Sequence, residues 1–487
     1  MRDGEAEREH APAERPNILL ILSDDHGYGD RGALGFDQAV LTPSLDRLAA
    51  EGVTCSDAYV TAPICNPSRA AIINGCYQAR WGSTWFRDTN FCESRTTMAE
   101  YFTELGYTCG YFGKVHYGNE GPGDRACPSE HGFHESYYGL AGRQQGRLNY
   151  LVHSAAAVEE YGPEAQWRMA VQPMLHNGEE VELDGFLTAE LGHRTREFMT
   201  STDGPFFAMV SFNAVHNFCW QLPADELERR GLPAKTDWHD GDELDYSDWY
   251  DGAISPNLEH GREYYLAQLE LMDAEIGRLL DSLEDSGAAE NTIVVYLTDN
   301  GGSTCNYGNN TPLSGTKYTL SEGGVRVPYL VRWPGGGWTG GRCASGLVSS
   351  MDLCPTLLAA AGRDVAELGF DGIDQAAHWR AETDRGHESL HWETGDQSAV
   401  RCADMKLRIT HGDSVQVRGI REREHVRVDD GVHLFDLSTD IAEAHDLLAH
   451  SPEQARALWD RHAAWLTDVG RSDLAERHGA RVMAALT

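Results

Sequence analysis

The chain has 487 residues, of which 41% are hydrophobic and 24% are charged, enough for a large core in two or three domains of ordinary size. Asp and Glu total 76 against 40 Lys and Arg, so the formal net charge is -36 at pH 7. Binding to nucleic acid or anionic lipid needs clustered basic residues, and a surface of this sign repels both. The composition therefore excludes a nucleic-acid-binding protein.

No apolar run in the sequence approaches the roughly 20 residues of a membrane-spanning helix. Residues 1–16 form a polar tail without the apolar centre of a signal peptide. We therefore expect no membrane partner and a cytoplasmic protein, or a periplasmic or secreted one if a leader was removed. The 11 cysteines show no regular spacing, so we expect most thiols to be free.

Short apolar runs alternate with helical patterns through the first 360 residues. The runs predict buried strands at Asn17–Leu22, Tyr107–Phe112, Phe206–Phe212 and Thr292–Leu297. Helical spacing of apolar residues predicts helices at Ser44–Glu51, Thr96–Leu105 and Tyr264–Leu283. Continuous apolar strands suit a sheet that helices cover on both faces. The alternation predicts an α/β fold around a large, mostly parallel sheet.

The pattern changes near Gly362, and the turn-rich residues 363–386 predict a linker. After it, a long helix at Pro452–Leu466 follows strand-like stretches at Ser389–Glu393, Ala399–Arg401, Met405–Ile409 and Val432–Leu437. We expect a tail at 1–16, a catalytic α/β domain at 17–375 and, at 376–487, a smaller α+β subdomain of antiparallel strands with a packed helix. Residues 120–184 and 225–251 lack clear periodicity, so we expect insertion loops there.

Polar residues directly follow four of the predicted strands. They are Asp24 and Asp25, Lys114 and His116, His216, and Asp299 and Asn300. Ligands bind outside the carboxyl ends of parallel strands, where these residues would meet. Carboxylate and amide oxygens suit Ca²⁺ or Mg²⁺, and adjacent aspartates buried without a cation would repel each other. Either acidic motif alone could cap a helix or form a turn, but together they predict a divalent metal site.

A second candidate lies at the start of an apolar helical run. Pro67 marks a helix N-terminus, where free backbone N–H groups favour an anion. Cys65 lies just before this end, and Arg69 lies one turn inside it. The segment predicts either an activated thiolate beside an anion-binding arginine or a cysteine packed at a helix start.

The segment from Cys65 to Arg69, Cys-Asn-Pro-Ser-Arg, resembles the Cys-x-Pro-Ser-Arg signature of the type I sulfatases, which belong to the alkaline phosphatase superfamily. The resemblance covers nearly the whole chain. Its further motifs are Gly75 and Arg80, Gly113–His116, Lys317 before Glu322–Pro328, and Leu434–Leu437. His216 also matches, although Val215 stands where the family has proline.

The resemblance implies an enzyme that hydrolyses a sulfate monoester to an alcohol and inorganic sulfate. In this family a maturation enzyme oxidises the signature cysteine, here Cys65, to formylglycine, whose hydrate is the nucleophile. The implied ligands of one divalent cation, usually Ca²⁺ and less often Mg²⁺, are Asp24, Asp25, Asp299, Asn300 and the modified Cys65.

The resemblance also implies a role for each remaining polar residue. Arg69 and Lys114 would hold the hydrate, and Lys317 would bind the sulfate. His216 would stabilise or protonate the leaving alcohol. His116 would take a proton from the second hydroxyl of the sulfated hydrate, which releases sulfate. A serine has no second hydroxyl, which explains the modified cysteine.

The sequence does not identify the substrate. Many relatives of this shape act on sulfated sugars, often at a chain end, and the negative charge favours a small or terminal substrate. Candidate contacts are Trp85, Arg87, Asp88 and Trp392, each of which could equally pack or lie in a solvated loop. A phosphonate or phosphate-diester hydrolase using the same formylglycine, or a non-catalytic binder of sulfated glycans, are the alternatives, and the oligomeric state stays open.

Overall fold

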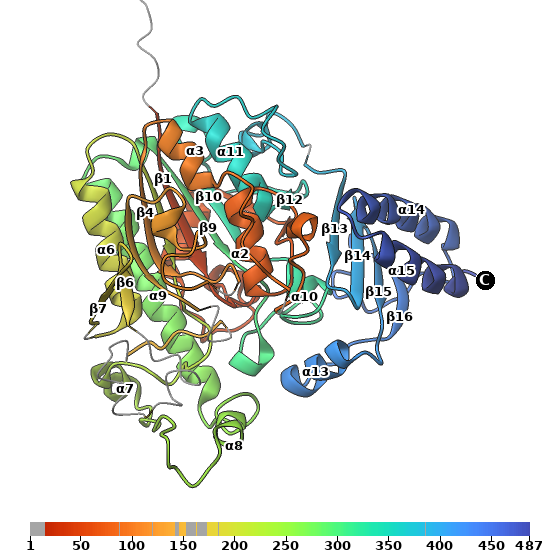
Figure 1. The fold of residues 1–487 in the computed structure, drawn as a ribbon, viewed down its shortest axis with the longest axis horizontal. Coiled ribbons are helices and arrows are strands. Elements are labelled where there is room, and N and C mark those ends of the chain that lie inside the picture. Colours follow the sequence, from red (N-terminus) through yellow and green to blue (C-terminus); the bar gives the residue numbers. More distant parts are fainter. Residues whose placement is uncertain are drawn as a thin grey trace, which may run out of the picture.

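The structure, a computed structural model, describes residues 15–86, 88–118, 120–141, 146–151, 162, 173–183, 185–384 and 386–487. A large α/β domain lies beside a smaller subdomain that carries its own four-stranded sheet (Figure 1). In the described part of the chain, no helix is both long and apolar enough to cross a membrane. All 11 cysteines lie in that part, and none forms a disulfide, as expected.

Ten strands of the described residues form the large sheet, in the order β11-β2-β10-β9-β1-β8-β4-β5-β6-β7. Its centre is parallel and consists of β9 (Thr292–Thr298), β1 (Asn17–Ser23), β8 (Phe206–Ser211), β4 (Thr108–Lys114) and β5 (Glu135–Gly139). The outer strands are β10 (Tyr329–Arg332), β2 (Val53–Cys55), β11 (Arg342–Ala344), β6 (Met174–His176) and β7 (Glu179–Val181). Strands β10, β6 and β7 pair antiparallel with their neighbours. The predicted α/β fold is confirmed, with a mixed sheet.

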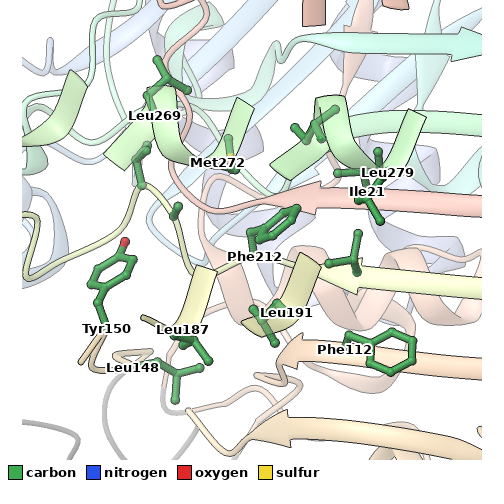
Figure 2. Close-up of a cluster of buried hydrophobic side chains, with 14 of the residues drawn as sticks. Ile21, Phe112, Leu148, Tyr150, Leu187, Leu191, Phe212, Leu269, Met272 and Leu279 are labelled. Atoms are coloured by element: carbon green, nitrogen blue, oxygen red, sulfur yellow. The ribbon is translucent and has the colours of Figure 1, made fainter. Parts of the chain in front are cut away.

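Helices cover both faces of the sheet because successive residues of each strand point to opposite sides. In β1, Leu19 and Ile21 pack in one core and Leu20 packs in the other. The first core receives α1 (Pro43–Glu51), α6 (Leu187–Ser201) and α9 (Gly261–Asp285), as Figure 2 shows in part. The second receives α2 (Cys65–Asn74), α3 (Met98–Glu104) and α11 (Leu353–Ala360). The two cores make the central strands rigid supports for the loops at their ends.

Two stretches that were expected to be insertion loops contain regular structure. Residues 120–184 contribute β5, β6 and β7 to the sheet, and the second stretch contains α7 (Ala224–Arg230) and α8 (Tyr246–Asp251). The prediction was wrong here because neither stretch shows a clear period. In β5, Tyr137 and Tyr138 are both fully buried, one in each core. Burial on both faces removes the alternation that identifies a strand.

The smaller subdomain contains an antiparallel sheet of β13 (Ser389–Glu393), β14 (Gln397–Cys402), β15 (Met405–Thr410) and β16 (Gly431–Asp436). These strands confirm the prediction, as does α14 (Pro452–Asp468). Two helices were not predicted, α13 (Val415–Glu424) and α15 (Ser472–Ala485). Helices α14 and α15 cover the outer face of the sheet, while Leu390 and Ala399 pack against Val60 and Val325 of the large domain.

Residues 363–386, expected to be a linker, are partly built into the large domain. They contain α12 (Ala376–Trp379), and Trp379 is fully buried in the second core. Its ring lies 4.8 Å from that of Trp338. The segment is therefore fixed by packing at its centre.

Candidate active site

The four polar strand ends lie at one edge of the sheet, as predicted. Strand β1 lies between β9 and β8, and β8 also pairs with β4, all in parallel. The register pairs Ser23 with Thr298, and Leu22 and Gly113 with Ser211. The residues that follow these positions, Asp24, Asp25, Lys114, His116, His216, Asp299 and Asn300, are all buried. The shared edge brings together residues that are up to 276 positions apart in the sequence.

Three cations face three carboxylates at this edge. Lys114 forms a salt bridge with Asp24, and Lys317 Nζ lies 2.7 Å from Asp25 Oδ1. Arg69 Nε lies 2.7 Å from Asp299 Oδ2. Charges this deeply buried are tolerated only when each is paired. The pairs therefore orient both lysines and the arginine toward one point.

Helix α2 supplies Cys65 and Arg69. Cys65 is the first residue of the helix, and the whole helix is buried. Arg69, one turn further on, donates hydrogen bonds to Ser211 Oγ at 2.6 Å and to the Lys114 carbonyl at 3.2 Å. The start of α2 is thus fixed to the ends of β8 and β4. Ser211 was not predicted as a site residue, because a serine at a strand end carries no motif.

The thiol of Cys65 is not an activated thiolate. Burial raises the pKa of Cys65 to about 12, against the opposing effect of Lys317 and Lys114. At neutral pH the group is a neutral thiol, which is a weak nucleophile. Of the two alternatives, burial favours the packed cysteine over the activated thiolate.

The donor set fits a hard divalent cation. Ligand atoms of Asp24, Asp25, Cys65 and His216 all lie within 4.8 Å of one another. Asp24 Oδ1 and Asn300 Oδ1 are buried without hydrogen-bond partners. Burial and the nearby Asp299 raise the pKa of Asp24 to about 7, which a further positive charge would reverse. Asp24, Asp25, Asp299 and Asn300 supply the oxygen ligands that Ca²⁺ and Mg²⁺ prefer.

Two asparagines orient Asp25, the predicted Asn300 and the unpredicted Asn306. Asn300 Nδ2 donates to Asp25 Oδ1 at 2.7 Å, and Asn306 Nδ2 donates to Asp25 Oδ2 at 3.0 Å. Asn306 Nδ2 also lies 3.1 Å from Asn217 Oδ1. Asn306 and Asn217 were not predicted, because isolated asparagines in loops carry no signal. Their positions become informative only once the loops are placed.

Both predicted histidines lie at the site and carry free ring nitrogens. His216 Nε2 lies 3.6 Å from Asp25 Oδ2, and Nδ1 of both His216 and His116 is buried without a partner. A Cβ atom on Gly146 would lie 2.7 Å from His116 Cε1, so the glycine allows its loop to approach the ring. Burial lowers the pKa of both histidines well below the usual value.

The predicted substrate contacts divide into three groups. Trp85 is half-buried, with its ring 6.1 Å from that of Tyr318, the neighbour of Lys317. Asp88 is exposed in the same loop, and Arg87 lies outside the described residues. Trp392 is only 1% exposed, and its indole N–H donates to the Val60 carbonyl at 2.7 Å. The prediction for Trp392 was wrong, because this side chain packs in the core between the domains.

A model of the sulfatase family matches residues 16–363. The chain belongs to the sulfatase family. Arylsulfatase A of Bos taurus is 29% identical over 477 residues, which cover 91% of this chain and 86% of that protein. A sulfatase of Formosa agariphila is 26% identical over 518 residues, which cover 93% and 89% of the two chains.

Solved structures share this fold. The structure of Ps i-CgsB in complex with k-i-k-neocarrahexaose superposes with a TM-score of 0.75 at 26% identity, over 94% of each chain. The PsFucS1 sulfatase from Pseudoalteromonas sp. superposes with a TM-score of 0.70 at 24% identity, over 94% of this chain and 92% of that one. The resemblance to type I sulfatases, within the alkaline phosphatase superfamily, is confirmed, and this sulfatase is a sulfuric ester hydrolase.

Proposed function

We propose that this sulfatase removes sulfate from the end of a sulfated carbohydrate, using formylglycine made from Cys65 and a bound Ca²⁺. The observation that carries the proposal is the position of Cys65, at the start of α2, within one cluster with Asp24, Asp25 and His216. A carbohydrate substrate is supported by Ps i-CgsB, which was solved with k-i-k-neocarrahexaose.

Modification of Cys65 would replace its buried neutral thiol, which is a weak nucleophile. A hydrated aldehyde at this position would supply two hydroxyl groups, one to attack sulfur and one to release the product. A divalent cation held by Asp24, Asp25, Asp299 and Asn300 would supply positive charge that polarises the ester and acidifies the attacking hydroxyl. The partner that this proposal requires is a formylglycine-generating maturation enzyme.

The buried cations bind and orient the reacting groups. Lys114 and Arg69 lie against Asp24 and hold the hydroxyl groups at position 65. Lys317, beside Asp25, binds the sulfate oxygens and offsets the charge that develops on the leaving oxygen. Because all three side chains are at most 1% exposed, their charges act without screening by water.

The two histidines handle the protons. His216 donates a hydrogen bond or a proton to the leaving alcohol oxygen, and its place beside Asp25 supports this role. His116 takes a proton from the second hydroxyl at position 65, for which its unpartnered Nδ1 supplies an acceptor. The two steps use different rings. We therefore expect substitution of His216 to slow release of the alcohol and substitution of His116 to slow release of sulfate.

Burial of the site supports action at a chain end. Cys65 and Lys317 are each 1% exposed, so little of either side chain is open to a substrate. A terminal sugar needs room on one side of the ester only, whereas an internal sugar needs room for the chain on both sides. The acidic surface, with a net charge of -36, also disfavours a long polyanion.

The test is a peptide mass spectrum across Cys65, on protein co-expressed with a formylglycine-generating enzyme, followed by assays of sulfate release. We expect the aldehyde and faster release from terminally sulfated oligosaccharides than from internally sulfated ones. Aldehyde with turnover only of phosphonate or phosphate diesters would contradict the proposed substrate. Aldehyde with binding but no turnover would favour a glycan-binding protein instead.

A further inference from the structure

Helix α13 of the smaller subdomain reaches the catalytic edge of the large domain, the edge of the sheet where Asp24, Asp25 and Asp299 lie. It lies between β15 and β16 in the chain, and Figure 1 shows it below their sheet, away from α14 and α15. It contacts the turn Thr304–Asn306, whose Asn306 donates to Asp25. None of the residues given a role in the proposed reaction belongs to α13.

Glu424 fixes the end of α13 to two loops of the site, the one that follows Asp299 and Asn300 and the one that leads to Lys317. Its carboxylate, only 2% exposed, accepts hydrogen bonds from Ser303 Oγ at 2.9 Å, the Cys305 backbone N–H at 3.2 Å and Thr316 Oγ1 at 3.1 Å. Ser303 follows the Asp299-Asn300 loop, and Thr316 precedes Lys317. The residue next to Glu424 is therefore held in a defined place relative to Lys317.

That residue is Arg423, whose guanidinium group lies by the ring of Tyr318, the neighbour of Lys317. Arg423 Cζ and Lys317 Nζ each lie 5.5 Å from the centroid of this ring, so the two cationic groups are at most about 11 Å apart. Arg423 is exposed, and within the described residues it forms no ion pair with a carboxylate. Arg423 Nη1 instead donates a hydrogen bond to the Tyr318 hydroxyl at 3.5 Å.

A second aromatic residue borders the same position. Burial raises the pKa of Tyr250, and the charges of Arg147 and Arg423 oppose this rise. Arg147 Cζ lies 4.5 Å from the centroid of its ring. Asn217 donates a hydrogen bond to that hydroxyl and accepts one from Asn306. Tyr250 is thus linked by hydrogen bonds to the Asp25 side of the site, while Tyr318 adjoins Lys317.

Aromatic surface suitable for a sugar lies next to Arg423. The half-buried rings of Trp85 and Phe86 lie 6.1 Å and 5.7 Å from the Tyr318 ring. Sugars pack their apolar faces on aromatic rings, and guanidinium groups bind sulfate or carboxylate through paired N–H donors. Aromatic rings and the guanidinium group of Arg423 therefore lie together near Lys317.

We propose that Arg423 binds a second anionic group, a sulfate or a carboxylate, on the sugar whose sulfate ester is held at Lys317, with Trp85 packing against the sugar. The substrate class is therefore a carbohydrate with at least two acidic substituents on one sugar or on adjoining sugars. This inference rests on the proposed function, because it assumes that the scissile sulfate lies at Lys317.

The test measures binding without turnover. In a Cys65→Ala background with calcium present, calorimetry compares a monosulfated monosaccharide, the disulfated form of that sugar and a monosulfated disaccharide that contains a uronate. We expect the second anion to tighten binding and Arg423→Ala to weaken the two dianionic ligands about 10- to 100-fold, as for a lost charge-assisted contact. Arg423→Lys should recover part of the loss, because the charge stays while the paired donors go.

Arg418→Ala is the matched control, an exposed arginine on the same helix, and should bind every ligand as the parent does. Tighter binding of the disulfated sugar alone, or of the uronate alone, identifies the second anion as sulfate or carboxylate. Equal affinity for mono- and dianionic sugars, or an equal loss in Arg423→Ala for both, would overturn the proposal. Selective binding together with no turnover by aldehyde-containing enzyme would count against the proposed function and leave the Arg423 site intact.

Discussion

The catalytic edge, where Asp24, Asp25 and Asp299 meet three cations, and the junction between the two domains each bury a cluster of ion pairs. Among the described residues of the two clusters, buried oxygens without a hydrogen-bond partner occur only at the first. At the junction, Lys406 Nζ lies 2.7 Å from Glu322 Oε1 and 3.4 Å from Glu443 Oε1. Arg408 adds a contact to Glu443 at 3.2 Å. At the catalytic edge, by contrast, Asp24 and Asn300 each keep a buried oxygen without a partner.

The carboxylates of the two clusters respond differently to burial. Burial would raise the pKa of Glu322, but Lys406 and two nearby arginines outweigh it and lower this pKa to about 2. At the catalytic edge, burial and Asp299 raise the pKa of Asp24 to about 7. Buried charge by itself therefore does not mark an active site. A buried cluster whose pairing is incomplete marks the place where a ligand or metal supplies the missing charge.

The largest expected effect comes from Cys65→Ala, which removes the atom on which the proposed chemistry depends. We expect sulfate release by mature enzyme to fall at least about 1,000-fold, with little change in melting temperature. The control is Cys109→Ala, a buried cysteine in β4 outside the site, which should retain turnover. Normal sulfate release by Cys65→Ala would contradict the mechanism.

Asp299→Asn tests whether the incompletely paired cluster is a metal site. We expect calcium affinity, measured by elemental analysis after equilibrium dialysis, to fall about 10- to 100-fold or more, because a charged ligand is lost. Glu322→Gln, the corresponding change in the paired cluster, should leave calcium binding unchanged. If both variants bind calcium like the parent, Asp299 is not a ligand.

Glu322→Gln should instead reduce stability. The substitution leaves Lys406 with Glu443 as its carboxylate contact and removes a partner of Arg326. We expect the free energy of unfolding in urea to fall by about 3 kcal/mol, as when one partner of a buried ion pair is removed. A change below about 0.5 kcal/mol would show that the junction does not depend on this pair.

The smallest effect is the pH dependence of the difference in unfolding free energy between the parent and Glu322→Gln. The folded-state pKa of Glu322 is lowered from 4.5 to about 2, so its ionisation adds stability that is fully present above pH 4.5. This contribution is lost as the pH falls from 4.5 toward 2. The gap in unfolding free energy between parent and Glu322→Gln should therefore be constant above pH 5 and narrow below it. A gap that stays constant down to pH 3 would rule out ionised Glu322 as its source.

Local patterns in the sequence were enough to predict the frame of the site. Apolar runs predicted four of the five central strands, and the polar residues after each of them predicted where Asp24, Lys114, His216 and Asp299 would meet. This works because parallel strands place their carboxyl ends at one edge whatever their order in the chain. The signature beginning at Cys65 added the start of α2, where helix geometry alone brings Arg69 to the same side.

The tertiary structure decided the features that depend on which segments are neighbours. Ser211 contacts Arg69 because β8 lies between β1 and β4, and Asn306 reaches Asp25 because its loop folds back over the strand ends. Trp392 lies in the core instead of the site, while the unpredicted α13 brings Arg423 and Glu424 to the catalytic loops. The sequence alone determined four central strands and the polar residues that follow them, because these depend on local periodicity and spacing, while the signature at Cys65 indicated the helix through the family resemblance. Pairing, burial and the position of Arg423 arise from contacts between segments far apart in the chain, and local patterns do not encode which distant segments meet.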